Sequence, residues 1–265
     1  MKSDFHVHTS FSKDSESPPE ELIQEGIRRG IRTICITDHQ DLDYSEPGFE
    51  IEFETYFPEL KMLKEKYKEQ INVRIGMEFG LQPHLGDVCR KLAAEHSFDY
   101  IIGSLHLVDG QDPYYRTYFD DKTDEEGYRR TFELTLENIK SCYEFDALGH
   151  IDYIVRYGKN QAQDYSYSRY ADYLDEILKF LIENGKALEL NTGGWKYGLS
   201  FAHPHREVLK RYKELGGEMI TIGSDGHRPE HLAYDFHRVN DYLKACGFEY
   251  YTEFCRRKPY FCAIP

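Results

Sequence analysis

The chain alternates between short apolar runs and longer segments that carry one apolar face. Several of the apolar runs are nearly continuous rather than alternating, as expected of strands that are buried on both faces of a sheet. Seven such runs lie near residues 3–8, 33–37, 72–79, 99–105, 145–150, 187–191 and 218–223. We predict that each run is a strand.

Segments with helical periodicity separate the predicted strands. The first begins at Ser17-Pro18-Pro19-Glu20, where a Ser cap, a Pro at the first helical position and a Glu three residues after the cap predict a helix start. Gly30 is predicted to end this helix. Further helices are predicted near 58–69, 124–141, 169–184, 205–215 and 229–245.

Alternating strands and helices predict a parallel sheet with right-handed crossovers. Seven strand–helix units predict a TIM-like (β/α)7 barrel, and the length of 265 residues is typical of an α/β barrel that forms one domain. We therefore expect a single domain over residues 1–265, with a C-terminal helix and an aromatic tail over about 229–265. Two positions are possible for the tail: it closes the barrel, or it packs against the barrel.

Composition and charge narrow the class of protein. The net charge of -14 argues against a dedicated nucleic-acid binder. No apolar run approaches the roughly 18 residues that span a bilayer, and the N-terminus enters the first strand at once, so we expect neither a membrane segment nor a signal peptide. The six cysteines show no paired spacing, which favours free thiols in a reducing cytoplasm.

Histidines and carboxylates recur directly after the predicted strands. Because the carboxyl ends of parallel barrel strands meet at the catalytic rim, these side chains are expected to converge. Each has a simpler interpretation when taken alone: a hydrogen-bonded core histidine, a turn aspartate, or an ion pair of Glu78 with Arg74. These separate interpretations would all have to be true for side chains that meet at one rim of one barrel. A single metal cluster explains the whole set and is therefore favoured. The residues are His6, His8, Asp38, His39, Glu78, His106, His150, Asp225 and His227.

Imidazole and carboxylate ligands without thiolate suit Zn, Mn or Fe. Two or three adjacent divalent ions are a recurring device for phosphoryl chemistry. Phosphate monoesters need such help because their uncatalysed hydrolysis is among the slowest reactions known. A metal-dependent hydrolase is therefore the leading hypothesis.

The motifs resemble, in order along nearly the whole chain, those of the polymerase-and-histidinol-phosphatase (PHP) family. Within the family, segments 149–158, 189–194 and 224–236 are most similar to the branch that acts on histidinol phosphate. The matching motifs are His6-Val7-His8-Thr9, Thr37-Asp38-His39, Gly76-Met77-Glu78, Ser104-Leu105-His106, Gly149-His150-Ile151-Asp152 and Gly223-Ser224-Asp225-Gly226-His227.

The resemblance implies a distorted (β/α)7 barrel with a trinuclear centre that holds two or three divalent metal ions. Some relatives have His where this chain has Asp14, and a carboxylate there would shift the metal preference toward Mn or Fe. Asp38 is expected to orient a ligand rather than to bind metal. The implied ligands are His6, His8, Glu78 and Asp225 for the first ion, Glu78 with His106 and His150 for the second, and Asp14, His39 and His227 for the third.

Substrate phosphate should also meet cationic side chains. Arg156 follows the fifth predicted strand, Lys196 the sixth and Arg116 the fourth, so each is a candidate, with a solvated surface charge as the alternative. Catalytic roles are expected for Glu78, Asp225, His227 and Arg156. The remaining histidines are expected to be surface or capping residues: His84, His96, His203, His205, His231 and His237.

The resemblance implies a phosphomonoesterase that hydrolyses L-histidinol phosphate, a small-molecule ester, in histidine biosynthesis. Two alternatives stay open from the residues. One is a PHP enzyme that acts on another ester, such as a nucleotide or an oligonucleotide 3′ end. The other is a metal-binding module that has lost catalysis. The oligomeric state is not predicted.

Overall fold

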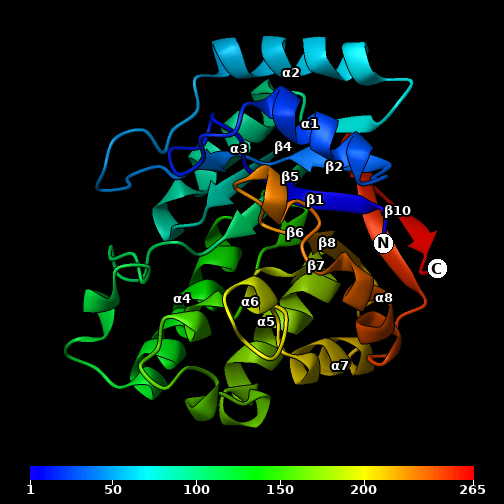
Figure 1. The fold of residues 1–265 in the computed structure, drawn as a ribbon. Helices are drawn as coiled ribbons and strands as arrows, with labels where there is room; N and C mark the ends of the chain where they lie inside the picture. The colour runs from blue at the N-terminus through cyan, green and yellow to red at the C-terminus, as the bar shows by residue number, and fades with distance from the viewer.

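The computed structural model describes all 265 residues and contains one parallel sheet curved into a barrel (Figure 1). All seven predicted strands are present, in the order β1-β2-β4-β5-β6-β7-β8, and a short β3 lies beside β4. The (β/α)7 barrel is therefore confirmed. The strands are β1 (Ser3–Val7), β2 (Thr33–Ile36), β3 (His39–Gln40), β4 (Asn72–Gly80), β5 (Tyr100–Ser104), β6 (Ala147–Leu148), β7 (Ala187–Asn191) and β8 (Ile220–Gly223).

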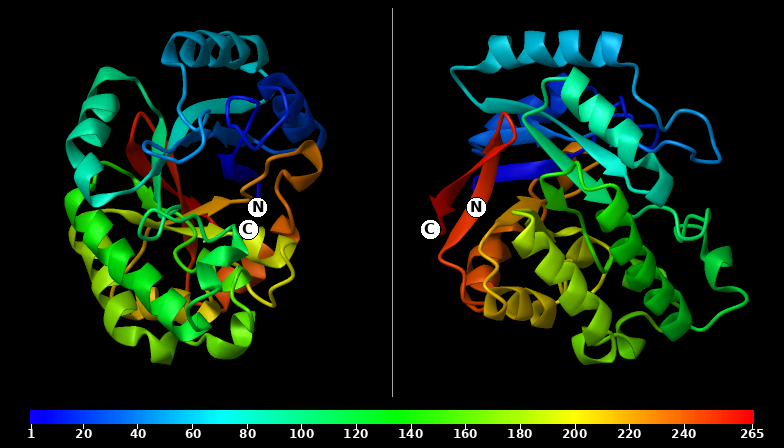
Figure 2. Two further views of the ribbon diagram at one scale, coloured as in Figure 1. Left: turned by 90° about the vertical axis from the view of Figure 1, so that its left-hand side faces the viewer. Right: turned by 180° about the vertical axis from the view of Figure 1, so that it is seen from behind.

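Helices surround the barrel (Figure 2). None of them combines the length and the apolar character that crossing a lipid bilayer requires. The helices are α1 (Pro19–Arg28), α2 (Phe53–Tyr67), α3 (Gly86–Glu95), α4 (Asp124–Ser141), α5 (Ala171–Glu183), α6 (Gly193–Lys196), α7 (Arg206–Glu214) and α8 (Phe236–Lys244).

Several details of the helices differ from the sequence prediction: α6 was not predicted, and α8 begins at Phe236 rather than near residue 229. The first helix is not capped by Ser17: Pro18 is the N-cap residue and provides no side-chain cap. The Ser17 hydroxyl instead donates to the carbonyl oxygen of His227 at 3.2 Å, so a partner distant in sequence replaces the local one. Helix α2 begins at Phe53, ahead of the predicted start, with Pro58 inside it. Helix α3 was not predicted at all, because little of it is buried: Cys89 is its one buried residue.

The barrel closes between β1 and β8 without a regular ladder. A single bridge joins Val7 to Gly226, and the backbone amide of His8 donates to the carbonyl of Gly226 at 2.9 Å. The backbone amide of Asp225 donates to the carbonyl of His6 at 2.9 Å, and the buried Asp4 carboxylate adds a further link because it accepts from the Ser224 amide at 2.9 Å and the Ala233 amide at 2.8 Å. Burial raises the pKa of Asp4 to about 6.

The aromatic tail forms an antiparallel hairpin of β9 (Tyr250–Cys255) and β10 (Lys258–Ala263), which the sequence analysis missed. Its contacts are with the beginnings of the barrel strands: the amide of Arg257 donates to the carbonyl of Asp99, and the Arg257 side chain pairs with Asp146 at 3.1 Å. The two chain ends accordingly lie side by side in all three ribbon views (Figures 1 and 2). The tail therefore closes the end of the barrel opposite the strand-end histidines.

Phe254 of β9 fills the interior of that end. It is 2% exposed and belongs to a small apolar cluster separate from the main core. The other members come from five barrel strands: Phe5, Cys35, Tyr100, Ile102, Ala147 and Ala187. Cys35 is buried and free, as predicted, and the other five cysteines are free as well.

Replacing Phe254 with Ala should lower the free energy of unfolding by about 3–5 kcal/mol, because it leaves a cavity inside the barrel. Phe261, on β10, is 52% exposed, and Phe261→Ala should change the free energy of unfolding by less than about 0.5 kcal/mol. Urea unfolding of both variants measures the difference. Equal effects of the two substitutions would mean that the hairpin does not plug the barrel.

Candidate metal centre

The nine implied metal ligands converge at the carboxyl ends of the strands. His6 and His8 come from the end of β1, His39 from β3 and Glu78 from β4. His106, His150 and the Asp225–His227 turn follow β5, β6 and β8. Asp14, from the loop after β1, completes the set because its Oδ2 lies 3.0 Å from His227 Nε2 and 3.6 Å from His39 Nε2. The sequence prediction that these side chains meet is confirmed, whereas their assignment to individual ions stays a prediction.

Glu78 lies at the centre of the cluster. Its side chain is 1% exposed, and its two oxygens lie 3.0–3.4 Å from the nitrogens of five imidazoles. No Lys or Arg pairs with it, so the ion pair with Arg74 is excluded. Burial alone would raise the pKa of Glu78, but the imidazoles of His6, His106 and His39 hold it well below its ordinary value. The five imidazoles belong to His106 and His150 on Oε1 and to His6, His8 and His39 on Oε2.

Several ligand atoms in the cluster lack a hydrogen-bond partner. They are Nε2 of His6, Nε2 of His8, Nδ1 of His39, Nδ1 of His150 and Oε2 of Glu78. A buried polar atom without a partner is costly, and native proteins contain few of them. Buried imidazole and carboxylate atoms that lack a hydrogen-bond partner are available to bind a divalent cation. The donor set therefore fits metal ions.

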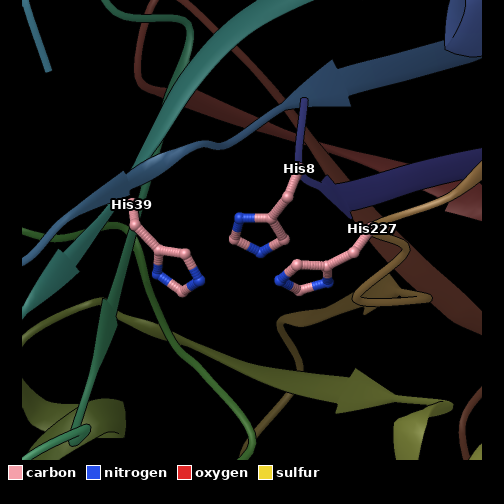
Figure 3. Close-up of side chains that lie close together, drawn as sticks. All are labelled: His8, His39 and His227. Atoms are coloured by element: carbon pink, nitrogen blue, oxygen red, sulfur yellow. The ribbon is translucent and has the colours of Figure 1, made fainter. Parts of the chain in front are cut away.

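The rings of His8, His39 and His227 point into the same space (Figure 3). The ring centroids of His39 and His227 lie 4.2 and 4.1 Å from that of His8. Burial lowers the pKa of His8 well below its ordinary value, and the facing His227 and His39 lower it further. A neutral imidazole presents the lone pair that a metal binds.

Four groups of three residues place one ligand atom each within 4.8 Å of one another. Three of the groups contain only implied ligands. The fourth adds Asp41, which the sequence analysis missed. The groups are His8–His39–His227, His6–His8–Asp225, His6–Glu78–His150 and His39–Asp41–His106.

Buried carboxylates orient two of the ligand imidazoles. Glu189 Oε1 lies 2.6 Å from Nδ1 of His6, and Asp41 Oδ1 lies 2.7 Å from Nδ1 of His106. Although burial would raise it, the neighbouring His106 holds the pKa of Asp41 at about 2, so this carboxylate stays an acceptor. Such partners fix the orientation of a metal-binding imidazole. Glu189 carried the same sequence signature as Glu78, an acid inside an apolar strand.

Asp38 acts through Ser12. The Ser12 hydroxyl donates to Asp38 at 2.7 Å and lies 3.2 Å from Nδ1 of His8. Asp38 also accepts from the amide of Thr9 at 2.5 Å, which fixes the loop after β1. This contact is consistent with the expected orienting role of Asp38.

The cluster forms the floor of a cavity of about 520 Å³ with largely aromatic walls. Arg156 lines this cavity, as expected of a phosphate ligand. Its guanidinium lies 5.5, 4.7 and 4.3 Å from the ring centroids of Tyr153, Tyr157 and Tyr197, and its Nε has no hydrogen-bond partner. Cation–π contacts of this kind hold the guanidinium in place.

The other two candidate cations lie elsewhere. Lys196 is absent from the cavity wall, and its Nζ donates to the carbonyls of Asp225 at 2.6 Å and Ser224 at 3.4 Å. Arg116 is exposed in a short 3₁₀ turn and does not line the cavity. Lys13 and Arg228, which the sequence analysis did not single out, line it instead.

The expectation of surface or capping positions was wrong for one of the remaining histidines, His203. His203 is fully buried, with Nδ1 2.7 Å from Asp152, because its loop folds back onto the end of β7. His231 lines the cavity. His205 does cap a helix: its Nδ1 accepts from the Glu207 amide at the start of α7.

A seven-unit barrel that gathers imidazoles and carboxylates at its strand ends defines a class, the barrel-type metal-dependent hydrolases. The chain belongs within this class to the PHP domain family, whose sequence model matches residues 4–193. Its similarity to individual members extends over almost its full length.

A probable histidinol-phosphatase of Clostridium acetobutylicum is 33% identical over 94% of this chain and 95% of its own. The histidinol-phosphatase of Lactococcus lactis subsp. lactis is 30% identical over 97% and 96%. The crystal structure of the Lactococcus lactis histidinol phosphate phosphatase, complexed with zinc, L-histidinol and phosphate, superposes with a TM-score of 0.89 at 29% identity, covering 98% of both chains.

Glu189→Gln should weaken metal binding about 10- to 100-fold, because an amide orients the His6 imidazole less strongly than a carboxylate does. Competition with a metal chelator measures the affinity. The matched control is Glu183→Gln, at an exposed position of α5. Equal affinities of the two variants would contradict the orienting role.

Lys196→Met should lower the free energy of unfolding by about 1–3 kcal/mol, because the buried carbonyl of Asp225 loses its donor. Inhibition by inorganic phosphate should be unchanged. Lys179→Met, on the exposed side of α5, is the control. Weaker phosphate inhibition at unchanged stability would show that Lys196 binds substrate instead of holding the turn.

Proposed function

We propose that this protein is a metal-dependent phosphomonoesterase that hydrolyses L-histidinol phosphate to L-histidinol and phosphate in histidine biosynthesis. The observation that carries the proposal is the Glu78-centred ligand cluster on the floor of a cavity that also holds Arg156. The nearly full-length similarity to a phosphatase whose structure contains zinc, L-histidinol and phosphate supports the choice of substrate.

The nine ligands would hold two or three divalent ions, with Glu78 shared by the first and second ligand sets. Bound divalent ions lower the pKa of a coordinated water and neutralise charge that develops on phosphorus. Imidazole and carboxylate ligands suit Zn, Mn or Fe, and Asp14, a harder ligand than the His found there in some relatives, would favour Mn or Fe at the third site.

The chain's own residues are proposed to bind and orient the ester. Arg156 presents N–H donors that match phosphate oxygens, and the surrounding tyrosines keep its charge beside the cavity floor. Asp225 faces both His8 and His227, at 3.4 and 3.5 Å, so it links the first and third ligand sets. The aromatic walls exclude water from the bound ester and strengthen these charge interactions.

A cavity of about 520 Å³ fits one small molecule rather than a polymer. The net charge of -14 also disfavours an oligonucleotide substrate. We propose a small-molecule ester as the partner, no nucleic acid or membrane, and a cytoplasmic location in which the six free cysteines stay reduced.

Phosphate release by the metal-reconstituted enzyme tests the proposal. L-Histidinol phosphate should be hydrolysed at least about 100-fold more efficiently than p-nitrophenyl phosphate or a short single-stranded DNA, since binding energy from the remote part of the true substrate lowers the barrier. Glu78→Gln should abolish the activity, whereas Glu183→Gln should retain it.

Two results would contradict the proposal in different ways. Hydrolysis of p-nitrophenyl phosphate without selectivity would keep a metal phosphoesterase but reject histidinol phosphate as its substrate. No hydrolysis of any of the three, with metals shown to be bound, would favour a non-catalytic metal-binding module.

A further inference from the structure

Two loops on the open side of the cavity are tied together by a reciprocal pair of hydrogen bonds. The hydroxyl of Tyr44, in the loop after β3, donates to Oδ2 of Asp112, in the loop after β5. The hydroxyl of Tyr115 crosses in the other direction and donates to Oε1 of Glu46 at 3.0 Å. Each loop therefore supplies one phenol and one carboxylate, and all four residues line the cavity.

The two carboxylates have no cationic partner. Neither Glu46 nor Asp112 lies within 4.0 Å of a Lys, Arg or His nitrogen, whereas surface acids such as Glu20, Asp87 and Asp109 form such pairs. Their phenolic partners bring no positive charge. Burial and the contact with Asp112 hold the pKa of Tyr44 well above its ordinary value, so the phenol remains protonated.

Both carboxylates also keep free acceptor capacity. A carboxylate offers about four lone-pair sites on its two oxygens. Asp112 uses one site for Tyr44 and one for the amide of Tyr114 at 2.8 Å, and Glu46 uses one for Tyr115. The remaining sites are available to a ligand that donates hydrogen bonds.

The cavity is therefore polarised. Its floor and Arg156 suit the phosphate dianion, whereas Glu46 and Asp112 place two negative charges on the wall formed by the two loops, beyond the one positive charge of Lys13, whose side chain lies beside Gly48. The rings of Tyr44 and Phe49 lie 4.1 Å apart, and the ring of Tyr114 lies 5.4 Å from that of Tyr115, so aromatic faces accompany both acids in the cavity lining. Aromatic faces beside carboxylates are a favourable environment for an organic cation.

We infer that Glu46 and Asp112 form a cation subsite that binds the amine-bearing end of the substrate and thereby selects phosphomonoesters with an ammonium or imidazolium group. The inference rests on the proposed function. It makes Glu46 and Asp112 the residues that discriminate against esters without a cationic group. The Tyr44–Asp112 and Tyr115–Glu46 hydrogen bonds hold the two carboxylates at the wall before substrate arrives, which reduces the cost of ordering them.

The test compares kcat and KM of Glu46→Gln, Asp112→Asn and the double variant on three esters. The esters are L-histidinol phosphate, O-phosphoethanolamine, which also carries an ammonium group, and p-nitrophenyl phosphate, which does not. Gln and Asn still accept the tyrosine hydrogen bonds, so these substitutions remove charge while keeping the loops tied. Glu50→Gln, an exposed acid of the same loop that does not line the cavity, is the matched control.

Each single substitution should raise KM for the two cationic esters about tenfold, as expected for the loss of one charge-assisted hydrogen bond. KM for p-nitrophenyl phosphate should stay the same or fall, because a repulsive charge has been removed. The variant Tyr44→Phe/Tyr115→Phe, which unties the loops but keeps both acids, should retain the preference for cationic esters.

Equal changes in KM for all three esters would overturn the inference, and so would a Tyr44→Phe/Tyr115→Phe variant that loses the preference as fully as the charge variants. Failure of the proposed function is distinguishable. Wild-type enzyme that cleaves O-phosphoethanolamine but not L-histidinol phosphate, with the same charge effect, would reject histidinol phosphate as the substrate and uphold the cation subsite.

Discussion

The structure depends on one buried carboxylate. Glu78 is surrounded by five imidazoles and has no Lys or Arg partner, so its negative charge must be balanced by cations that the imidazoles can also bind. Because Glu78 lies near the end of β4, strands on both sides can deliver ligands to it only at the same end of the barrel. The direction of the parallel sheet therefore determines where the chemistry takes place.

The two ends of the barrel carry different kinds of residue. At the beginnings of the strands, Phe254 fills the interior and Arg257 pairs with Asp146, so the C-terminal hairpin stabilises that end. At the carboxyl ends, polar side chains replace apolar ones and the cavity remains open. Asp4 contributes to both ends of the barrel. Its hydrogen bonds to Ser224 help to close the barrel on the same strand that carries the ligands His6 and His8.

The strands and the strand-end ligands could be predicted because both are local features of the sequence, whereas Asp14 was implied only by the resemblance to the PHP family. An apolar run followed by His, Asp or Glu is visible without any partner, and barrel topology then brings the ligands together. Residues whose roles depend on distant partners were harder to find. Glu189 and Asp41 orient imidazoles from other strands, and Lys196 binds a turn 28 residues away in place of the cavity. The hairpin was missed because its function lies in contacts with strand beginnings far away in the sequence.

Anomalous diffraction from a crystal grown with zinc tests the central claim most directly, because it locates each ion relative to Glu78. We predict two peaks at coordination distance, about 2.0–2.2 Å, from the two oxygens of Glu78, and a third between Asp14, His39 and His227. A Glu78 carboxylate without a metal neighbour, hydrogen-bonded to protonated imidazoles while zinc occupies other positions, would contradict it.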